Sequence, residues 1–136
     1  MQLLSQYTQK LDPQRRVVVP SRMREEIGEE ELARGLYLTR GLDGCLFLYP
    51  PSKWERVSGR LSEDLFLSAE GRSTQRKVFG NAVVVVPDKL GRILLSPRLL
   101  ELAGLEDEVV FVGVGDRIEL WSPERWAAQD AAEGDE

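Results

Sequence analysis

The stretch LDPQRRVVVP at residues 11–20 has a close counterpart, PDKLGRILLSP, at residues 87–97 of the same chain. Both contain an aspartate four positions before an arginine, and in both the arginine opens an apolar run typical of a strand. Proline or glycine near the aspartate is typical of a tight turn. The chain therefore carries an acidic residue, a turn, an arginine and an apolar strand twice, which indicates a fold of two related units.

The repetition extends beyond these stretches. A shift of 76 positions aligns charged and glycine residues of the two units: Asp12 with Asp88, Arg16 with Arg92, Arg22 with Arg98, and Gly28 with Gly104. Residues 36–54 then align with residues 109–126, so that Trp54 corresponds to Trp126. In a chain of 136 residues neither unit would bury enough apolar surface to be stable alone, so we expect both to share one core.

The turn in each unit has residues suited to its geometry. Pro13 directly after Asp12 suits the first two positions of a type I turn, and Gly91 suits a position where φ is positive. Arg15 occupies the position equivalent to Gly91. If the first turn is also left-handed there, Arg15 costs roughly 1 kcal/mol relative to glycine.

Each unit is predicted to continue with a short helix after its second strand. The helix is clearest at residues 96–104, where Ser96 suits the N-cap, Pro97 the first helical position and Gly104 the end. Residues 20–28 are its counterpart in the first unit.

A hairpin follows the helix in each unit, at residues 35–49 and 108–121. The apolar strands at 83–86 and 109–112 are expected in the core, as is Cys45. The predicted organisation is a first unit at 5–51, a helical connector at 52–81, a second unit at 82–125 and an acidic tail at 126–136. The connector carries a basic cluster that suits either a solvated helix face or a phosphate contact: Arg72, Arg76 and Lys77.

Composition excludes several classes of function. Apolar residues make up 42% of the chain and charged residues 30%, as in ordinary globular proteins. One cysteine excludes an intrachain disulfide, and the absence of histidine removes His-dependent catalysis and most transition-metal sites. No apolar run is long enough to span a bilayer, and the N-terminus lacks a signal-peptide pattern. We expect a cytoplasmic protein without catalytic residues, cofactor or metal.

The net charge of −5 hides an uneven distribution. Residues 1–24 contain five basic side chains and one acidic side chain, Asp12. Residues 124–136 contain five acidic side chains and one basic side chain, Arg125, and we expect this segment to be disordered. A basic N-terminal region is compatible with a nucleic-acid partner despite the overall charge.

Two interpretations of the turn arginines follow from the pattern. One is an ion pair with the aspartate, worth about 1 kcal/mol or less if exposed. The other is a DNA contact, because a guanidinium matches guanine O6 and N7 in the major groove, where a two-stranded ribbon fits. The repetition favours the DNA-contact interpretation. Two equivalent arginines in each chain, present in several copies in an oligomer, can contact successive turns of a duplex. Neighbouring basic residues would contact phosphates: Arg15, Lys89, Arg22 and Arg98.

Three segments and the paired turns resemble the MraZ proteins, bacterial regulators encoded at the head of the division and cell-wall gene cluster. The segments are TRGLDGCLFLYPPSKWERV (39–57), DKLGRILLSP (88–97) and LAGLEDEVVFVGVGDRIELWSPERW (102–126). The resemblance runs from about residue 5 to residue 128 and leaves out the acidic tail. It implies an α+β, β-rich fold: two tandem AbrB-like (SpoVT/AbrB-type) swapped-hairpin half-units forming one pseudo-twofold β-barrel, with flanking helices.

The resemblance also implies a function. Family members assemble into rings of subunits and bind short direct repeats in the promoter of their own operon, usually to repress it. The turn arginines of the family read the DNA. Carried over by position, these are Arg16 and Arg92, with Asp12 and Asp88 shaping the turns. The implied partners are double-stranded promoter DNA in the nucleoid and further copies of the chain.

Two positions depart from the family pattern. Arg15 replaces the usual glycine of the first turn, and Gln14 replaces a frequent lysine, so the first turn is expected to use other phosphate contacts. Two further classes of function remain open. A protein-interaction ring would bind an acidic protein partner through the turns, and an AbrB-class antitoxin would normally have one unit per chain. Salt dependence and sequence preference of DNA binding would discriminate these classes.

Overall fold

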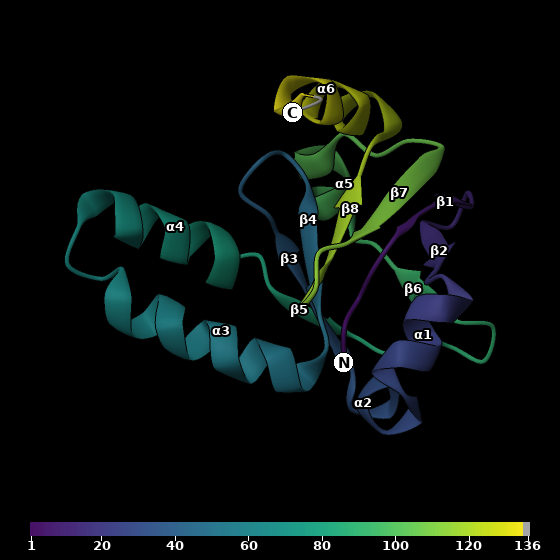
Figure 1. Ribbon diagram of the computed structural model, residues 1–136, viewed down its shortest axis with the longest axis horizontal. Helices are drawn as coiled ribbons and strands as arrows, with labels where there is room; N and C mark the ends of the chain where they lie inside the picture. Colours follow the sequence, from purple (N-terminus) through teal and green to yellow (C-terminus); the bar gives the residue numbers. More distant parts are fainter. Residues whose placement is uncertain (135–136) are drawn as a thin grey trace.

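The computed structural model describes residues 1–134, and its main feature is a sheet of six antiparallel strands (Figure 1). The strands follow the order β1, β7, β8, β4, β3, β5 across the sheet. Their bounds are β1 Gln6–Lys10, β3 Leu36–Arg40, β4 Leu46–Tyr49, β5 Val83–Val85, β7 Glu108–Gly113 and β8 Ile118–Trp121. A separate ribbon pairs β2 (Arg16–Val18) with β6 (Arg92–Leu94).

The same 134 residues contain six helices. Their bounds are α1 Ser21–Ile27, α2 Glu29–Arg34, α3 Pro51–Asp64, α4 Ala69–Phe79, α5 Pro97–Ala103 and α6 Pro123–Glu133. Figure 1 shows α3 and α4 as a helical hairpin that extends from the sheet, on the side away from the ribbon. Within this part of the chain, no helix has the length and apolar content needed to cross a membrane. The expected α+β, β-rich class is confirmed.

Each unit contributes its first strand to the hairpin of the other unit. β1 pairs with β7, where Thr8 lies opposite Val110, and β5 pairs with β3, where Val84 lies opposite Tyr37. The two hairpins meet at the centre of the sheet, where β4 pairs with β8. Neither unit therefore has a complete sheet of its own, which explains in structural terms why the sequence is written twice in one chain.

Both units also contribute to one apolar core. Val17 of β2 and Ile93 of β6 lie opposite each other, and each is 1% exposed. They belong to the same buried cluster as Leu38, Leu48 and Phe111 of the main sheet. The short ribbon is thus anchored by apolar side chains that reach the core.

A second cluster lies on the opposite face of the sheet, because neighbouring residues of a strand point to opposite faces. Phe47 and Tyr49 of β4 belong to it together with Cys45, which is 2% exposed. Trp54 of α3 and Trp126 of α6 pack against this cluster. The prediction that Cys45 is a core residue is confirmed.

The expected closed barrel is wrong for the residues that the structure describes. β1 and β5 lie at opposite edges of the main sheet, and each pairs with one neighbouring strand. β2 and β6 pair with each other and with no strand of the main sheet. Within residues 1–134, no strand pairing therefore connects the edge strands β1 and β5.

The prediction that residues 83–86 lie in the core is wrong except for Val85, which packs against the buried cluster, whereas 109–112 are buried as expected. Val83, Val84 and Val86 are 42%, 53% and 57% exposed. β5 is an edge strand, so only one strand flanks it, and an apolar run alone does not distinguish an edge strand from a central one.

Helix α5 has the ends that its sequence predicted. Ser96 Oγ accepts a hydrogen bond from the N–H of Leu99 at 3.2 Å, and Gly104 is left-handed with φ 65°. Helix α2, between Gly28 and Gly35, was not predicted. The sequence of α2 has acidic residues in the first turn and an arginine in the last turn, which interact favourably with the helix dipole. This pattern is a weak indication of a helix when the segment has six residues.

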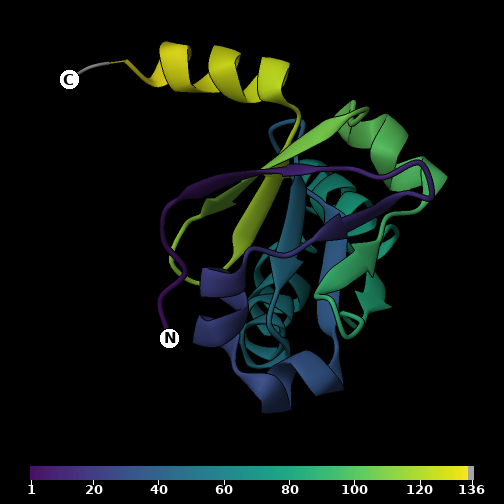
Figure 2. The same ribbon diagram turned by 90° about the vertical axis from the view of Figure 1, so that its right-hand side faces the viewer.

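The expected disorder of the acidic segment is wrong up to residue 133, because residues 123–133 form α6. Ser122 caps the helix, since its Oγ accepts a hydrogen bond from the N–H of Arg125 at 3.1 Å. Figure 2 shows α6 extending away from the body of the molecule. Residues 135–136 of this segment lie outside the described residues.

Candidate nucleic-acid interface

The carboxylate of Asp12 organises the first arginine turn, residues 12–16. Its Oδ1 accepts hydrogen bonds from the backbone N–H groups of Gln14 and Arg16, both at 2.9 Å. Its Oδ2 accepts a hydrogen bond from Arg16 Nε at 3.1 Å. One side chain thus holds both the backbone of the turn and the guanidinium.

The second arginine turn, residues 88–92, repeats this arrangement. Asp88 Oδ1 accepts hydrogen bonds from the N–H groups of Leu90 at 3.0 Å and Arg92 at 2.9 Å. Asp88 Oδ2 accepts a hydrogen bond from Arg92 Nε at 2.7 Å. The aspartate–arginine ion pair is therefore present in both turns, and the repeated sequence forms a repeated structure.

The backbone of the two turns is also the same. The N–H of Arg15 donates to the carbonyl of Asp12 at 3.0 Å, and the N–H of Gly91 donates to that of Asp88 at 2.8 Å. Both Arg15 and Gly91 are left-handed, with φ of 65° and 82°. This is the three-residue hairpin loop in which a left-handed residue follows a type I turn. The sequence left the backbone conformation of Arg15 open, and the structure shows that it is left-handed like Gly91.

The space beside the left-handed residue is filled differently in the two turns. A Cβ at Gly91 would lie 2.5 Å from Arg24 Cζ, because the Arg24 side chain fills that space and its Nε donates to the carbonyl of Val19 at 2.8 Å. In the first turn, Arg15 Nε donates to the equivalent carbonyl, that of Leu95, at 3.2 Å. An arginine therefore bonds the carbonyl after each ribbon strand, which gives Arg15 a structural role that the sequence did not reveal.

The ribbon presents both turn arginines on one face. Its central pair, Val17 and Ile93, points into the core, so the flanking pairs point outward. Arg16 and Arg92 belong to these flanking pairs and are diagonal neighbours, a relation in which long side chains can reach each other. Their side chains are 33% and 29% exposed. The antiparallel pairing thus brings together two arginines that the sequence places 76 positions apart.

The surroundings of Asp12 and Asp88 favour their charged forms. The N–H of Arg16 is the main cause that lowers the pKa of Asp12, and the N–H of Arg92 is the main cause that lowers the pKa of Asp88. A carboxylate that accepts several N–H groups is stabilised in its ionised state. Both aspartates therefore stay negative at neutral pH and hold the Nε side of their arginines.

The remaining predicted contact residues lie close to the ribbon in the chain. Arg22 is the second residue of α1 and Arg98 the second residue of α5, and these helices follow the two ribbon strands. Both side chains are exposed, as are Arg15 and Lys89 in the turns. Their contact with phosphates stays a prediction.

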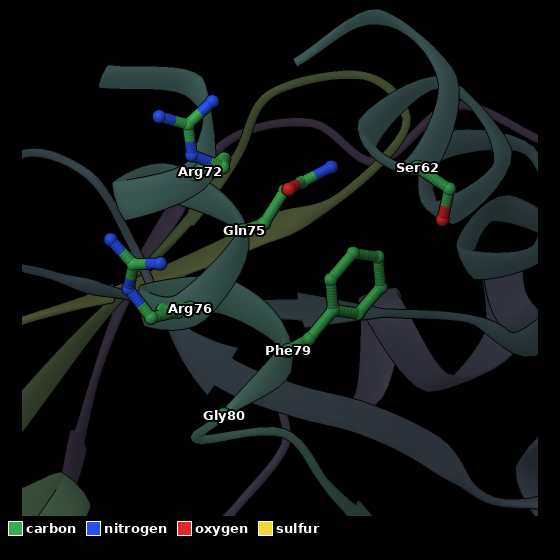
Figure 3. A pocket seen from close by; sticks show the side chains of 6 residues that line it. All are labelled: Ser62, Arg72, Gln75, Arg76, Phe79 and Gly80. Atoms are coloured by element: carbon green, nitrogen blue, oxygen red, sulfur yellow. The ribbon is translucent and has the colours of Figure 1, made fainter. Parts of the chain in front are cut away.

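The basic cluster of the connector lies elsewhere, on α4 (Figure 1). Arg72 and Arg76 line a pocket of about 670 Å³ together with Phe79 (Figure 3). Arg72 donates a hydrogen bond to the carbonyl of Phe66 at 3.0 Å. In Figure 3 both arginines point away from the ring of Phe79. All residues that line the pocket lie in or directly after α3 and α4, so it is not part of the ribbon surface.

Groups suited to other chemistry are scarce. No cluster of three or more His, Cys, Asp or Glu side chains within residues 1–134 is arranged to hold a metal ion. Burial raises the pKa of the Cys45 thiol to about 12, so this thiol is protonated at neutral pH and is a poor nucleophile.

Comparison with known proteins adds to this geometry. The model of a protein family described as "MraZ protein, putative antitoxin-like" matches the chain twice, at residues 3–77 and 78–134. The chain belongs to the MraZ family. The double match fits two tandem units, and together the matches cover the ribbon and both arginine turns of this MraZ chain.

Curated relatives of the MraZ family align with most of the chain. "Transcriptional regulator MraZ" of Heliobacterium modesticaldum is 43% identical over 91% of this chain and 83% of its own length. The protein of that name from Thermomicrobium roseum is 42% identical over 96% of this chain and 91% of its own length. The protein of the same name from Clostridium acetobutylicum is 37% identical over 90% of this chain and 83% of its own length.

Proposed function

We propose that this protein is a transcriptional regulator that binds DNA sequence-specifically through its two arginine turns. The observation that carries the proposal is the pair of identically built turns whose arginines share the outer face of one ribbon. A two-stranded ribbon fits the major groove of B-DNA, and β-ribbon DNA-binding proteins use this geometry. The names of the relatives, transcriptional regulators, support the same class of function.

In this proposal Arg16 and Arg92 read guanine. Asp12 and Asp88 bond the Nε of each guanidinium, which fixes its orientation. The terminal amino groups then donate toward guanine O6 and N7, although Nη2 of Arg16 also donates to Gln14 Oε1. Both aspartates and the left-handed Gly91 shape the turns. Exposed basic side chains around the ribbon contact phosphates and set its position on the duplex: Arg15, Lys89, Arg22 and Arg98.

We further propose that the chain works as a ring of identical subunits on direct repeats. Contacts from one ribbon are few, and several linked subunits add them through effective concentration. Exposed apolar side chains away from the ribbon support self-association, since contact with another copy would cover them. They include Phe66 and Leu67 between α3 and α4, at 58% and 81% exposed, and Val84 at the free edge of β5, at 53%.

The regulated promoter is proposed to be that of the protein's own operon, in the division and cell-wall gene cluster, and the effect is repression. This step rests on membership of the MraZ family. It assigns the protein to the cytoplasm, bound to the nucleoid. A reporter fused to the upstream region of the gene should be repressed by the wild-type protein and released by loss of both turn arginines.

The proposal is tested by fluorescence anisotropy of a labelled duplex from that upstream region against a scrambled duplex, across a salt titration. The test variant carries Arg16→Ala and Arg92→Ala. The control carries Arg56→Ala and Arg60→Ala, which remove two exposed positive charges from α3. Each good guanine contact is worth roughly 1–3 kcal/mol, so the test variant should lose about 30-fold or more in affinity and the control far less.

Three results would contradict the proposal. Equal binding to both duplexes would reduce the protein to a nonspecific DNA-binding protein. Equal losses of affinity in the two double variants would show that Arg16 and Arg92 contribute only positive charge and no specific base contact. An absence of binding at low salt would exclude DNA as the partner and favour a protein partner.

A further inference from the structure

The two arginine turns differ at all three positions between the aspartate and the arginine, and the middle position, Gln14 or Leu90, is exposed at the tip of each turn. Gln14 and Leu90 are each two residues before the turn arginine, and the N–H of each donates to the turn aspartate in the same way. Gln14 Oε1 accepts a hydrogen bond from Arg16 Nη2. A side chain at this position therefore lies beside the outer end of the guanidinium.

Leu90 cannot make the bond that Gln14 makes, because its side chain has no acceptor. Among the described residues, Arg92 is bonded by a protein side chain at Nε alone, whereas Arg16 is bonded at Nε and at Nη2. The two guanidinium groups thus differ in their immediate neighbour, an amide in the first turn and an isobutyl group in the second.

Leu90 also exposes much of its apolar surface at the tip of the turn, being 64% exposed. On the base edges of the major groove, the C5 methyl of thymine is the apolar group that a protein side chain can contact. An amide at the same position offers a donor and an acceptor instead. The side chains beside the two arginines therefore offer different contacts to a base next to the guanine.

We propose that the two turns read different base patterns and that residues 14 and 90 determine the difference. Leu90 contacts the methyl group of a thymine next to the guanine bound by Arg92, while Gln14 leaves the first turn insensitive to that methyl group. This inference rests on the proposed DNA-binding function and assigns a further specificity-determining residue to each turn.

The test uses the upstream duplex that the wild-type protein prefers and the same duplex with deoxyuridine in place of thymine, which removes only the methyl groups. Burying one methyl-sized group is worth about fourfold in affinity. The wild-type protein should therefore bind the deoxyuridine duplex about fourfold more weakly. Leu90→Ala should bind both duplexes equally, because the apolar contact is lost.

The reciprocal variants sharpen the test. Leu90→Gln should abolish the sensitivity to deoxyuridine, and Gln14→Leu should increase it, because the first turn then gains an apolar tip. Circular dichroism and sedimentation serve as controls, since both residues are exposed and neither substitution should alter folding or subunit number.

Wild-type binding that is equal on the two duplexes would overturn the inference and leave the proposed function intact. The inference would also be overturned if Leu90→Ala kept the wild-type sensitivity to deoxyuridine, or if its loss of binding accompanied dissociation of the subunits. A wild-type protein that does not prefer the upstream duplex over a scrambled one would overturn the proposed function and the inference together.

Discussion

A single carboxylate determines the shape of each arginine turn. Asp12 and Asp88 each bond two backbone N–H groups and one guanidinium, so removal of either side chain leaves three donors to solvent. The spacing of aspartate and arginine offered an ion pair as one of two interpretations, and the structure contains this pair in both turns. The sequence could not predict that Gln14 contacts Arg16 or that Arg24 fills the space above Gly91, because these contacts depend on the folded backbone.

The pKa of both aspartates should lie below the ordinary value of 3.8. A lowered folded-state pKa contributes stability that is present above the unfolded-state pKa and is lost as pH falls through the folded-state pKa. We therefore expect the turns to weaken below about pH 4. Carboxyl carbon NMR titration measures both values directly, and ordinary values for both aspartates would contradict the geometry described here.

Glu119 is predicted to stabilise the centre of the sheet. It is 8% exposed, accepts a hydrogen bond from Arg117 Nη2 at 2.8 Å, and accepts another from Trp121 Nε1 at 3.0 Å. Glu119→Ala leaves the partly buried guanidinium of Arg117 with only the exposed Asp116 as an ion-pair partner, and should lower the free energy of unfolding by about 2–3 kcal/mol. Urea unfolding measures the change. Glu108→Ala, which removes an exposed glutamate from β7, should change it by about 0.5 kcal/mol or less.

At the scale of elements, residue pattern predicted the type of most helices and strands but not their surroundings. The cap and stop residues of α5 predicted that helix correctly, because they act locally. The exposure of β5 and the openness of the sheet depend on strand order, which a valine run does not encode. The acidic composition of residues 124–136 indicated disorder, whereas the Ser122 cap at the start of α6 supports a helix there.

The helical hairpin of α3 and α4 provides a matched pair of glycine substitutions. A Cβ at Gly71 would lie 1.9 Å from the carbonyl oxygen of Leu65, so Gly71→Ala must displace backbone and should destabilise the protein by about 1–3 kcal/mol. Gly59 lies in α3 with open space around its Cα, so Gly59→Ala should stabilise by up to about 1 kcal/mol. Thermal unfolding measures both. Changes of the same sign would contradict the packing between α3 and α4.

At the scale of the whole molecule, the exchange of first strands makes the two units interdependent. Residues 1–80 alone would lack β7, to which β1 pairs, and β6, to which β2 pairs. We predict that the fragments 1–80 and 81–136 do not fold as monomers, and that mixing them restores the sheet. Circular dichroism with analytical ultracentrifugation tests this. A folded monomer of either fragment would contradict the strand exchange.

The central claim is that the turn arginines contact guanine in the major groove. Its most direct test is a duplex in which 7-deazaguanine replaces guanine, which removes the N7 acceptor and keeps Watson–Crick pairing. We predict that the wild-type protein binds this duplex at least about fivefold more weakly than the unmodified one. The variant with Arg16→Ala and Arg92→Ala should bind the two duplexes equally. Equal binding of both duplexes by the wild-type protein would contradict the claim.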